Sequence, residues 1–342
     1  MTSGRSLKRI FLGAITLGAI ASSVLIARAI NWNNFKLQNA ALTQVLHDQS
    51  QELDDIKLRQ GSTEIASRIK LDELLNGGPP KDGIPSIDQP KFDTAATTPF
   101  LPTDIVVGVV INGEAKAYPY KILNWHEIVN DTLGGINLTV SYCPLCDTIV
   151  TFNRGESTFG VSGKLYQSCL VMYDRADDSL YAQPWAMGII GEQANYNLER
   201  IPAVKTTLED WLAKYPNSQI LSTDTGYERD YTGYPYGTYY TNERIIFPVR
   251  NQEALAHHPK AIVSYIWEPN TDRPFNKFSG ASQQFVHSEI EELGEKTVEF
   301  NDRQVIAKWN EDLATVIVSE LDGEIIPSST AFAFVYPAFF EE

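Results

Sequence analysis

The feature that most constrains the fold of this chain is a series of short β-branched and aromatic runs that begins near residue 104. Runs rich in Val, Ile, Thr, Tyr and Phe lie at 104–113, 114–120, 138–142 and 147–152. Turn-forming pairs, Asn112-Gly113 and Gly134-Gly135, lie between them. Short runs of this composition between turn signals are typical of strands. We therefore predict a mainly β (α+β) fold, one large β-rich domain with a few short helices, over residues 70–342.

Two segments of this domain have a helical pattern. Residues 206–216 begin with Thr206 and Thr207, either of which can cap a first helical turn, and end at Pro216. Residues 121–132 place Ile122, Trp125 and Val129 on one face at helical spacing. We predict a helix at the first segment and one or two helical turns at the second.

The amino terminus has the pattern of a membrane-targeting segment. Arg5, Lys8 and Arg9 precede an uncharged apolar run at residues 10–27. As a helix this run would be about 27 Å long, at about 1.5 Å per residue, which just spans a bilayer. Positive charge before the span favours a cytoplasmic N-terminus and places the rest of the chain outside the cytoplasm.

The fate of this segment stays open between a signal-anchor, a signal peptide and an ordinary buried helix. The Ala27-Arg28-Ala29 triplet resembles a signal-peptidase site, so cleavage is one interpretation. We predict a signal-anchor or signal peptide at 1–31, a helical stalk or linker at 32–69, and an extracytoplasmic domain at 70–342. The expected partner of the N-terminal segment is the membrane.

The net charge is −15. Nucleic-acid binding requires a basic face that neutralises phosphates, so nucleic acid is excluded as a partner. The sequence does not identify a small-molecule or protein partner.

Cys143 and Cys146 form a Cys-x-x-Cys motif around Pro144 and Leu145. In thioredoxin-like proteins a helix continues from such a motif, and its N-terminus stabilises the thiolate. Here the motif is followed by residues 147–152, whose β-branched side chains are poor helix formers. The motif is therefore predicted to form a strand-turn-strand knuckle, a geometry that points two sulfurs at one metal.

Zinc or copper needs further ligands, and His126 is the nearest candidate. Cys169 and Met172 are further sulfur donors in the chain. The leading hypothesis is a zinc or copper site formed by His126, Cys143 and Cys146, and whether this site is redox-active stays open.

The same residues allow other functions. A thiolate at Cys143 or Cys146, with His126 as base and Glu127 or Asp131 orienting it, suits a cysteine-nucleophile enzyme or a thiol-disulfide enzyme. A purely structural disulfide is a further alternative.

A third function, a non-enzymatic surface module for a glycan or a partner protein, would use the Tyr-rich loop at 228–240. Whether the protein is an enzyme stays open.

Several stretches in one order resemble a known family, domain of unknown function 3179. They lie at 77–92, 115–135, 141–154, 159–175 and 225–231. The resemblance runs from about residue 70 almost to the C-terminus and implies a shared site at His126, Cys143 and Cys146, without implying an activity. The chain departs from the family pattern at Asp147 and Cys169. Further residues expected to support the site are Glu127, Asp131, Tyr142, Lys81, Asp82 and Asp174.

Overall fold

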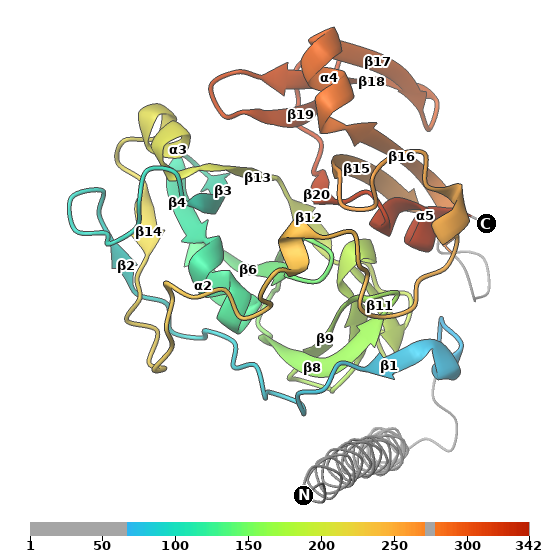
Figure 1. Cartoon of the computed structure of the whole chain (residues 1–342), viewed down its shortest axis with the longest axis horizontal. Helices are drawn as coiled ribbons and strands as arrows, with labels where there is room; N and C mark the ends of the chain where they lie inside the picture. The colour runs from blue at the N-terminus through green and yellow to red at the C-terminus, as the bar shows by residue number, and fades with distance from the viewer. Residues whose placement is uncertain (1–66, 271–277, 342) are drawn as a thin grey trace, which may run out of the picture. The chain divides into compact units, whose positions relative to one another are not determined.

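The computed structural model describes residues 67–270 and 278–341, all of which belong to one unit. This part of the chain is mainly β with a few short helices, as predicted (Figure 1). The segment predicted to be an anchor or signal peptide, and stalk residues 32–66, lie outside the described residues. Within the described residues, no helix is both long enough and apolar enough to cross a bilayer. Ser67, at the end of the predicted stalk, forms a β-bridge with Ile190.

Two neighbouring sheets carry the cysteines. The first has the strand order β1 (Leu74–Asn76), β8 (Phe159–Tyr166), β9 (Cys169–Asp174), β10 (Leu180–Ala182) and β11 (Met187–Ile190). The second has the order β12 (Glu199–Ile201), β7 (Thr148–Asn153), β6 (Ile136–Cys143) and β5 (Ile128–Leu133). Their aromatic side chains pack together, with the Phe152 and Phe159 rings edge to face at 4.9 Å between centroids. The three cysteines belong to this shared core.

A third sheet has its own core. Its order is β13 (Ala203–Thr207), β3 (Ile105–Ile111), β4 (Glu114–Pro119), β14 (Gln219–Leu221) and β2 (Phe92–Asp93), with β14 parallel to β4. The helices α2 (Tyr120–His126) and α3 (Leu208–Lys214) pack against it. The Thr207 hydroxyl caps α3 by accepting a hydrogen bond from the Asp210 amide, which confirms the predicted helix and cap.

The C-terminal part adds two small antiparallel sheets (Figure 1). One has the order β16 (Gly280–Val286), β15 (Ile262–Pro269) and β20 (Ser329–Phe332), and the other the order β17 (Glu295–Phe300), β18 (Arg303–Asn310) and β19 (Thr315–Glu320). Two α-helices lie in this part, α4 (His287–Leu293) and α5 (Val335–Phe340). Short 3₁₀ turns occur at η1 (Leu71–Glu73), η2 (Gln183–Trp185), η3 (Tyr239–Thr241) and η4 (Gln252–Ala254).

The prediction of helical turns over 121–132 is wrong in its second half. The helix α2 ends at His126, and Glu127 follows with a φ of 58°. A left-handed residue stops a helix, and the β-branched Ile128, Val129 and Thr132 then form β5. This change of direction is what places Glu127 and Asp131 in different surroundings.

Candidate thiol site

Two hairpin turns bring the three cysteines together. The first turn joins β6, which ends at Cys143, to β7, and contains Cys146, so the predicted strand-turn-strand knuckle is confirmed. The second turn, at Gln167 and Ser168, precedes Cys169 at the start of β9. All three cysteines are free thiols and are buried, with at most 1% of each residue exposed.

The sulfurs lie within hydrogen-bonding reach of one another. The Leu170 amide donates to Cys143 Sγ at 3.3 Å, and the Thr148 hydroxyl donates to Cys146 Sγ at 3.1 Å. Burial alone would raise the pKa of Cys143. Hydrogen bonds from the Cys146 and Cys169 thiols and from backbone amides outweigh burial and hold the pKa of Cys143 well below its usual range.

The other two thiols are affected in the opposite direction. Burial, together with the charge and hydrogen bonding of Cys143, raises the pKa of Cys146 well above its usual range. Burial, followed by hydrogen bonding with Cys143 and Cys146, raises the pKa of Cys169 well above its usual range. The cluster therefore favours one thiolate, at Cys143, hydrogen-bonded by two neutral thiols.

Glu127 is the acidic group beside this thiolate. Its carboxyl is buried, and burial followed by the charge of Cys143 raises the pKa of Glu127 well above its usual range. The Tyr236 hydroxyl donates to Glu127 Oε1 at 3.2 Å and opposes this shift. Glu127 is thus biased toward the neutral acid, which can give a proton to a leaving thiolate, and the carboxylate left behind can then take a proton from a thiol.

A cavity of about 310 Å³ borders the site. Glu127, Tyr236, Leu145 and Leu170 line it. Leu170 is the residue whose amide donates to Cys143 Sγ. The remaining lining is largely apolar. Glu127 is therefore accessible to a small molecule from the cavity, and Leu170 connects the cavity wall to the thiols through its amide.

A buried charged cluster fixes the other side of the knuckle. Asp147, fully buried at a φ of 51°, forms an ion pair with Lys205 and accepts a hydrogen bond from the Tyr240 hydroxyl at 2.7 Å. The Tyr142 hydroxyl, one of the predicted supporting groups, also donates to Asp147, at 3.2 Å. These bonds orient the residue that directly follows Cys146.

The Tyr-rich loop at 228–240 covers the site from outside. Besides Tyr236, which binds Glu127, the loop contributes Tyr239, whose hydroxyl donates to the Leu145 carbonyl oxygen at 2.6 Å. The Tyr231 hydroxyl of the same loop contacts the His126 ring. Several hydroxyls of the loop are therefore engaged with the protein interior.

The His126 ring forms its hydrogen bonds with groups other than the thiols. Its Nδ1 is 2.7 Å from the Pro85 carbonyl oxygen and its Nε2 is 2.7 Å from the Tyr231 hydroxyl. Burial lowers the pKa of His126 below its usual value. The structure thus brings Cys143, Cys146 and Glu127 together, whereas both ring nitrogens of His126 have partners other than sulfur.

The remaining predicted residues form ion pairs and hydrogen bonds elsewhere. Asp131 accepts from Lys116 Nζ at 2.8 Å and from the Tyr118 hydroxyl at 2.7 Å. Three further contacts connect predicted residues to β9 and the turn after it: Lys81 pairs with Asp178, Asp82 accepts from the Tyr173 hydroxyl, and Asp174 accepts from Ser157. Lys81 and Asp82 thus hold their segment against β9 and the turn after it, whereas Asp174 connects β9 to the residues just before β8.

The partners that complete the site are not apparent from the sequence. Cys169 entered only as an alternative sulfur donor, and the Glu127–Tyr236 and Asp147–Lys205 pairs join residues far apart in the chain. Only the nearness of two hairpin turns in space brings Cys169 to the knuckle, and spacing along the chain carries no signal of it.

In the described part of the chain, no group of three or more His, Cys, Asp or Glu side chains is arranged so that it could hold a metal ion. Metal binding by His126, Cys143 and Cys146 therefore stays a prediction.

The fold and site define a β-rich domain with a buried thiol cluster next to a small cavity. The chain belongs to the family described as "Protein of unknown function (DUF3179)", which matches residues 81–342. This confirms the family resemblance found in the sequence. No curated protein and no solved structure shows a significant match to the chain.

Proposed function

We propose that this domain carries out thiol–disulfide exchange at Cys143, Cys146 and Cys169. The observation that carries the proposal is the cluster itself, three free thiols within hydrogen-bonding reach, one of which has a lowered pKa. A thiolate is the attacking species in disulfide exchange, and a second thiol within reach completes the reaction. The cavity beside Glu127 is the proposed entry route for the substrate.

In the proposed first step the Cys143 thiolate attacks one sulfur of a substrate disulfide, R–S–S–R′. A mixed disulfide forms between Cys143 and R–S, and the R′–S⁻ leaving group takes the proton of Glu127. In the second step a neighbouring thiol gives its proton to Glu127 and attacks Cys143 Sγ. R–S⁻ leaves and is protonated by solvent. The protein dithiol is oxidised by two electrons, and the substrate disulfide is reduced to two thiols.

Both Cys146 and Cys169 lie within reach of Cys143 and qualify as the second thiol. The Thr148 hydroxyl donates to Cys146 Sγ, which stabilises developing negative charge on that sulfur. We therefore assign the second attack to Cys146.

The predicted location agrees with this chemistry. We propose that the domain is tethered to the membrane through its N-terminal segment and works on the extracytoplasmic side, where disulfides form and persist. The acidic surface, from a net charge of −15, favours neutral or cationic thiol substrates.

The direct test uses the reduced protein and hydroxyethyl disulfide. After an acid quench, alkylation and peptide mass spectrometry follow each cysteine with time. We expect a mixed disulfide at Cys143 that resolves to an internal disulfide, and that accumulates in a Cys146→Ser/Cys169→Ser variant. Loss of the carboxyl proton in Glu127→Gln should slow the first step about a hundredfold, a typical contribution of general acid catalysis.

Two results would rule out the proposed mechanism. One is a Cys143→Ser variant that reacts at the wild-type rate through another cysteine. The other is a native protein in which no cysteine reacts until denaturant unfolds it, which would make the cluster a purely structural part of the core.

Metal binding by the same sulfurs is the second candidate function. Cysteine thiolates are donors that Cu(I) and zinc prefer, and the chain offers the Cys143–Cys146 knuckle as a starting pair. Elemental analysis of protein purified without an affinity-tag metal tests this hypothesis. Stoichiometric copper or zinc that is lost in Cys143→Ser would support it, and metal-free protein with unmodified thiols would contradict it.

A further inference from the structure

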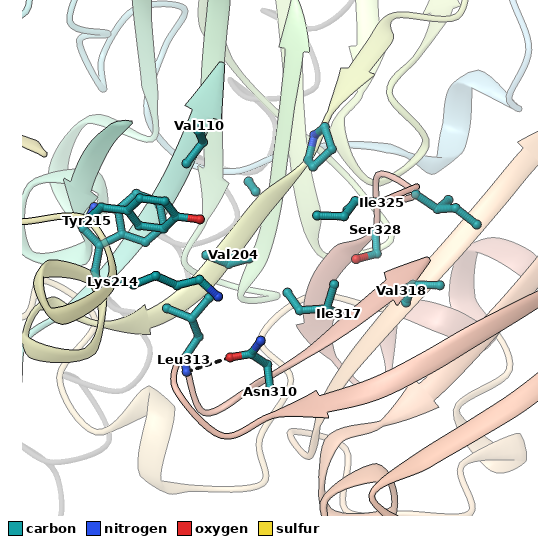
Figure 2. A pocket seen from close by; sticks show the side chains of 15 residues that line it. Val110, Val204, Lys214, Tyr215, Asn310, Leu313, Ile317, Val318, Ile325 and Ser328 are labelled. Carbon is teal, nitrogen blue, oxygen red and sulfur yellow. Dashed lines mark hydrogen bonds between the residues drawn. The ribbon is translucent and has the colours of Figure 1, made fainter. Parts of the chain in front are cut away.

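A second cavity, of about 370 Å³, lies apart from the thiol site. It is enclosed between β13 and α3 on one side and β19 and the segment at 325–328 on the other (Figure 2). Its volume falls within the range of about 300–1,000 Å³ that is usual for small-molecule sites. None of the three cysteines, nor Glu127, lines it.

Most of the lining is apolar. Val204, Leu313, Ile317 and Ile325 surround the cavity, and Trp211 forms part of its wall. Ile325 is a large apolar side chain that is 52% exposed. An aliphatic group placed here would remove this side chain and its neighbours from water, which is the main source of affinity for an apolar ligand.

One end of the cavity is polar. Figure 2 shows the side chains of Lys214 and Tyr215 at one side of the cavity, opposite Ile317 and Val318. Among the described residues, Lys214 has no ion-pair partner. No acidic side chain of the described residues lines the cavity, so the charge of Lys214 is not balanced there.

We propose that this cavity binds a single-chain aliphatic carboxylate. The chain would lie against Val204, Ile317 and Ile325, and the carboxylate would accept hydrogen bonds from Lys214 Nζ and the Tyr215 hydroxyl. Lys214 is the only cation among the described residues that line the cavity, and one positive charge matches a monocarboxylate better than a multiply charged phosphate. An uncharged aliphatic ligand would leave the head position unused.

Isothermal titration calorimetry with octanoate tests the proposal on the full-length protein. We expect saturable binding with one site per chain. Lys214→Gln should weaken octanoate binding about tenfold, because it removes a charge-assisted hydrogen bond. The matched control is Lys296→Gln, an exposed lysine on β17 that does not line the cavity, and this change should leave affinity unaltered.

Two further arms separate the head contact from general stickiness. Octanol should bind at least about tenfold more weakly than octanoate if the carboxylate makes the contact. Ile317→Trp fills the cavity from a half-buried position and should abolish binding of both ligands. Circular dichroism confirms that each variant is folded.

Several outcomes would overturn the proposal. They are no octanoate binding to the wild-type protein, equal loss in Lys214→Gln and Lys296→Gln, octanol binding as tight as octanoate, and full binding in a folded Ile317→Trp variant. Because Cys143 is not in this cavity, octanoate binding by Cys143→Ser should match the wild type whether or not the thiol proposal holds.

Discussion

Glu127 is the single residue whose surroundings say most about the proposed chemistry. It follows the last residue of α2 with a positive φ, and its carboxyl is buried where it interacts electrostatically with Cys143. A carboxyl group in water is ionised at neutral pH, whereas burial and the nearby thiolate favour the neutral form here. Glu127 thereby keeps its proton to a higher pH than a carboxyl group in water does.

The raised pKa of Glu127 predicts a pH dependence of stability. Below about pH 4.3 the carboxyl is protonated in both folded and unfolded chains. As pH rises above this value, the unfolded chain loses the proton first and the folded chain keeps it up to the raised pKa. The folded state then binds more protons, so the free energy of unfolding falls with rising pH across this window.

Glu127→Gln should remove this contribution. Urea unfolding between about pH 4.3 and neutral pH measures the difference between the two proteins. We expect the wild-type free energy of unfolding to fall more steeply with pH than that of the variant. Parallel pH profiles would show that Glu127 has an ordinary pKa and is not a proton reservoir.

At the scale of single elements, the turn between β6 and β7 depends on Asp147. Its carboxylate is buried against Tyr142 of β6 and against Lys205 and Tyr240, which come from two other segments of the chain. Removing one partner of a buried charge pair leaves the other charge poorly solvated. The turn that positions Cys146 therefore depends on one charged contact.

Asp147→Asn tests this dependence, because asparagine tolerates the left-handed backbone but has no charge. We expect a loss of about 2–3 kcal/mol in the free energy of unfolding, measured by urea denaturation. The control is Asp224→Asn, which breaks the exposed Lys91–Asp224 pair and should cost less than about 1 kcal/mol. Equal losses in the two variants would contradict a special role for Asp147.

The packing of α3 on β3 depends on a glycine. An added Cβ at Gly108 would lie 2.2 Å from the Trp211 ring, far inside van der Waals contact. Gly108→Ala should therefore push α3 away from the sheet and destabilise the fold by about 1–3 kcal/mol. Thermal unfolding measures this effect. Gly233→Ala is the matched control, since its nearest neighbour atom would be 3.5 Å away and its stability should change by less than about 0.5 kcal/mol. A Gly108→Ala variant as stable as this control would show that Trp211 can move without cost.

How far the sequence predicts the structure also differs between elements. The β-branched run after Cys146 correctly predicts a strand, and Thr207 correctly predicts the start of α3. The spacing of Ile122, Trp125 and Val129 also fits a helix, but Val129 lies in β5 because α2 ends before Glu127. Local pattern predicts elements with strong turn and cap signals and fails where one backbone reversal interrupts a periodic run.

At the scale of the whole molecule, the thiol site is assembled from segments that are distant in sequence. The Phe332 amide of β20 donates to the Cys146 carbonyl oxygen at 2.9 Å, and the Tyr239 hydroxyl donates to the Leu145 carbonyl oxygen at 2.6 Å. The residue types of Cys143, Cys146 and Glu127 suggest chemistry from the sequence alone. The third sulfur, from β9, cannot be predicted in this way, because contacts between separate hairpins leave no periodic pattern in one chain.

The central claim is that these thiols form a reversible redox centre, and an equilibrium redox titration tests it most directly. The native protein is equilibrated with glutathione buffers of graded potential, quenched and analysed by alkylation and mass spectrometry. We predict a single two-electron transition that joins Cys143 to Cys146, is fully reversible, and is lost in Cys143→Ser. Three thiols that stay reduced at every potential while the protein remains folded would contradict the proposed function.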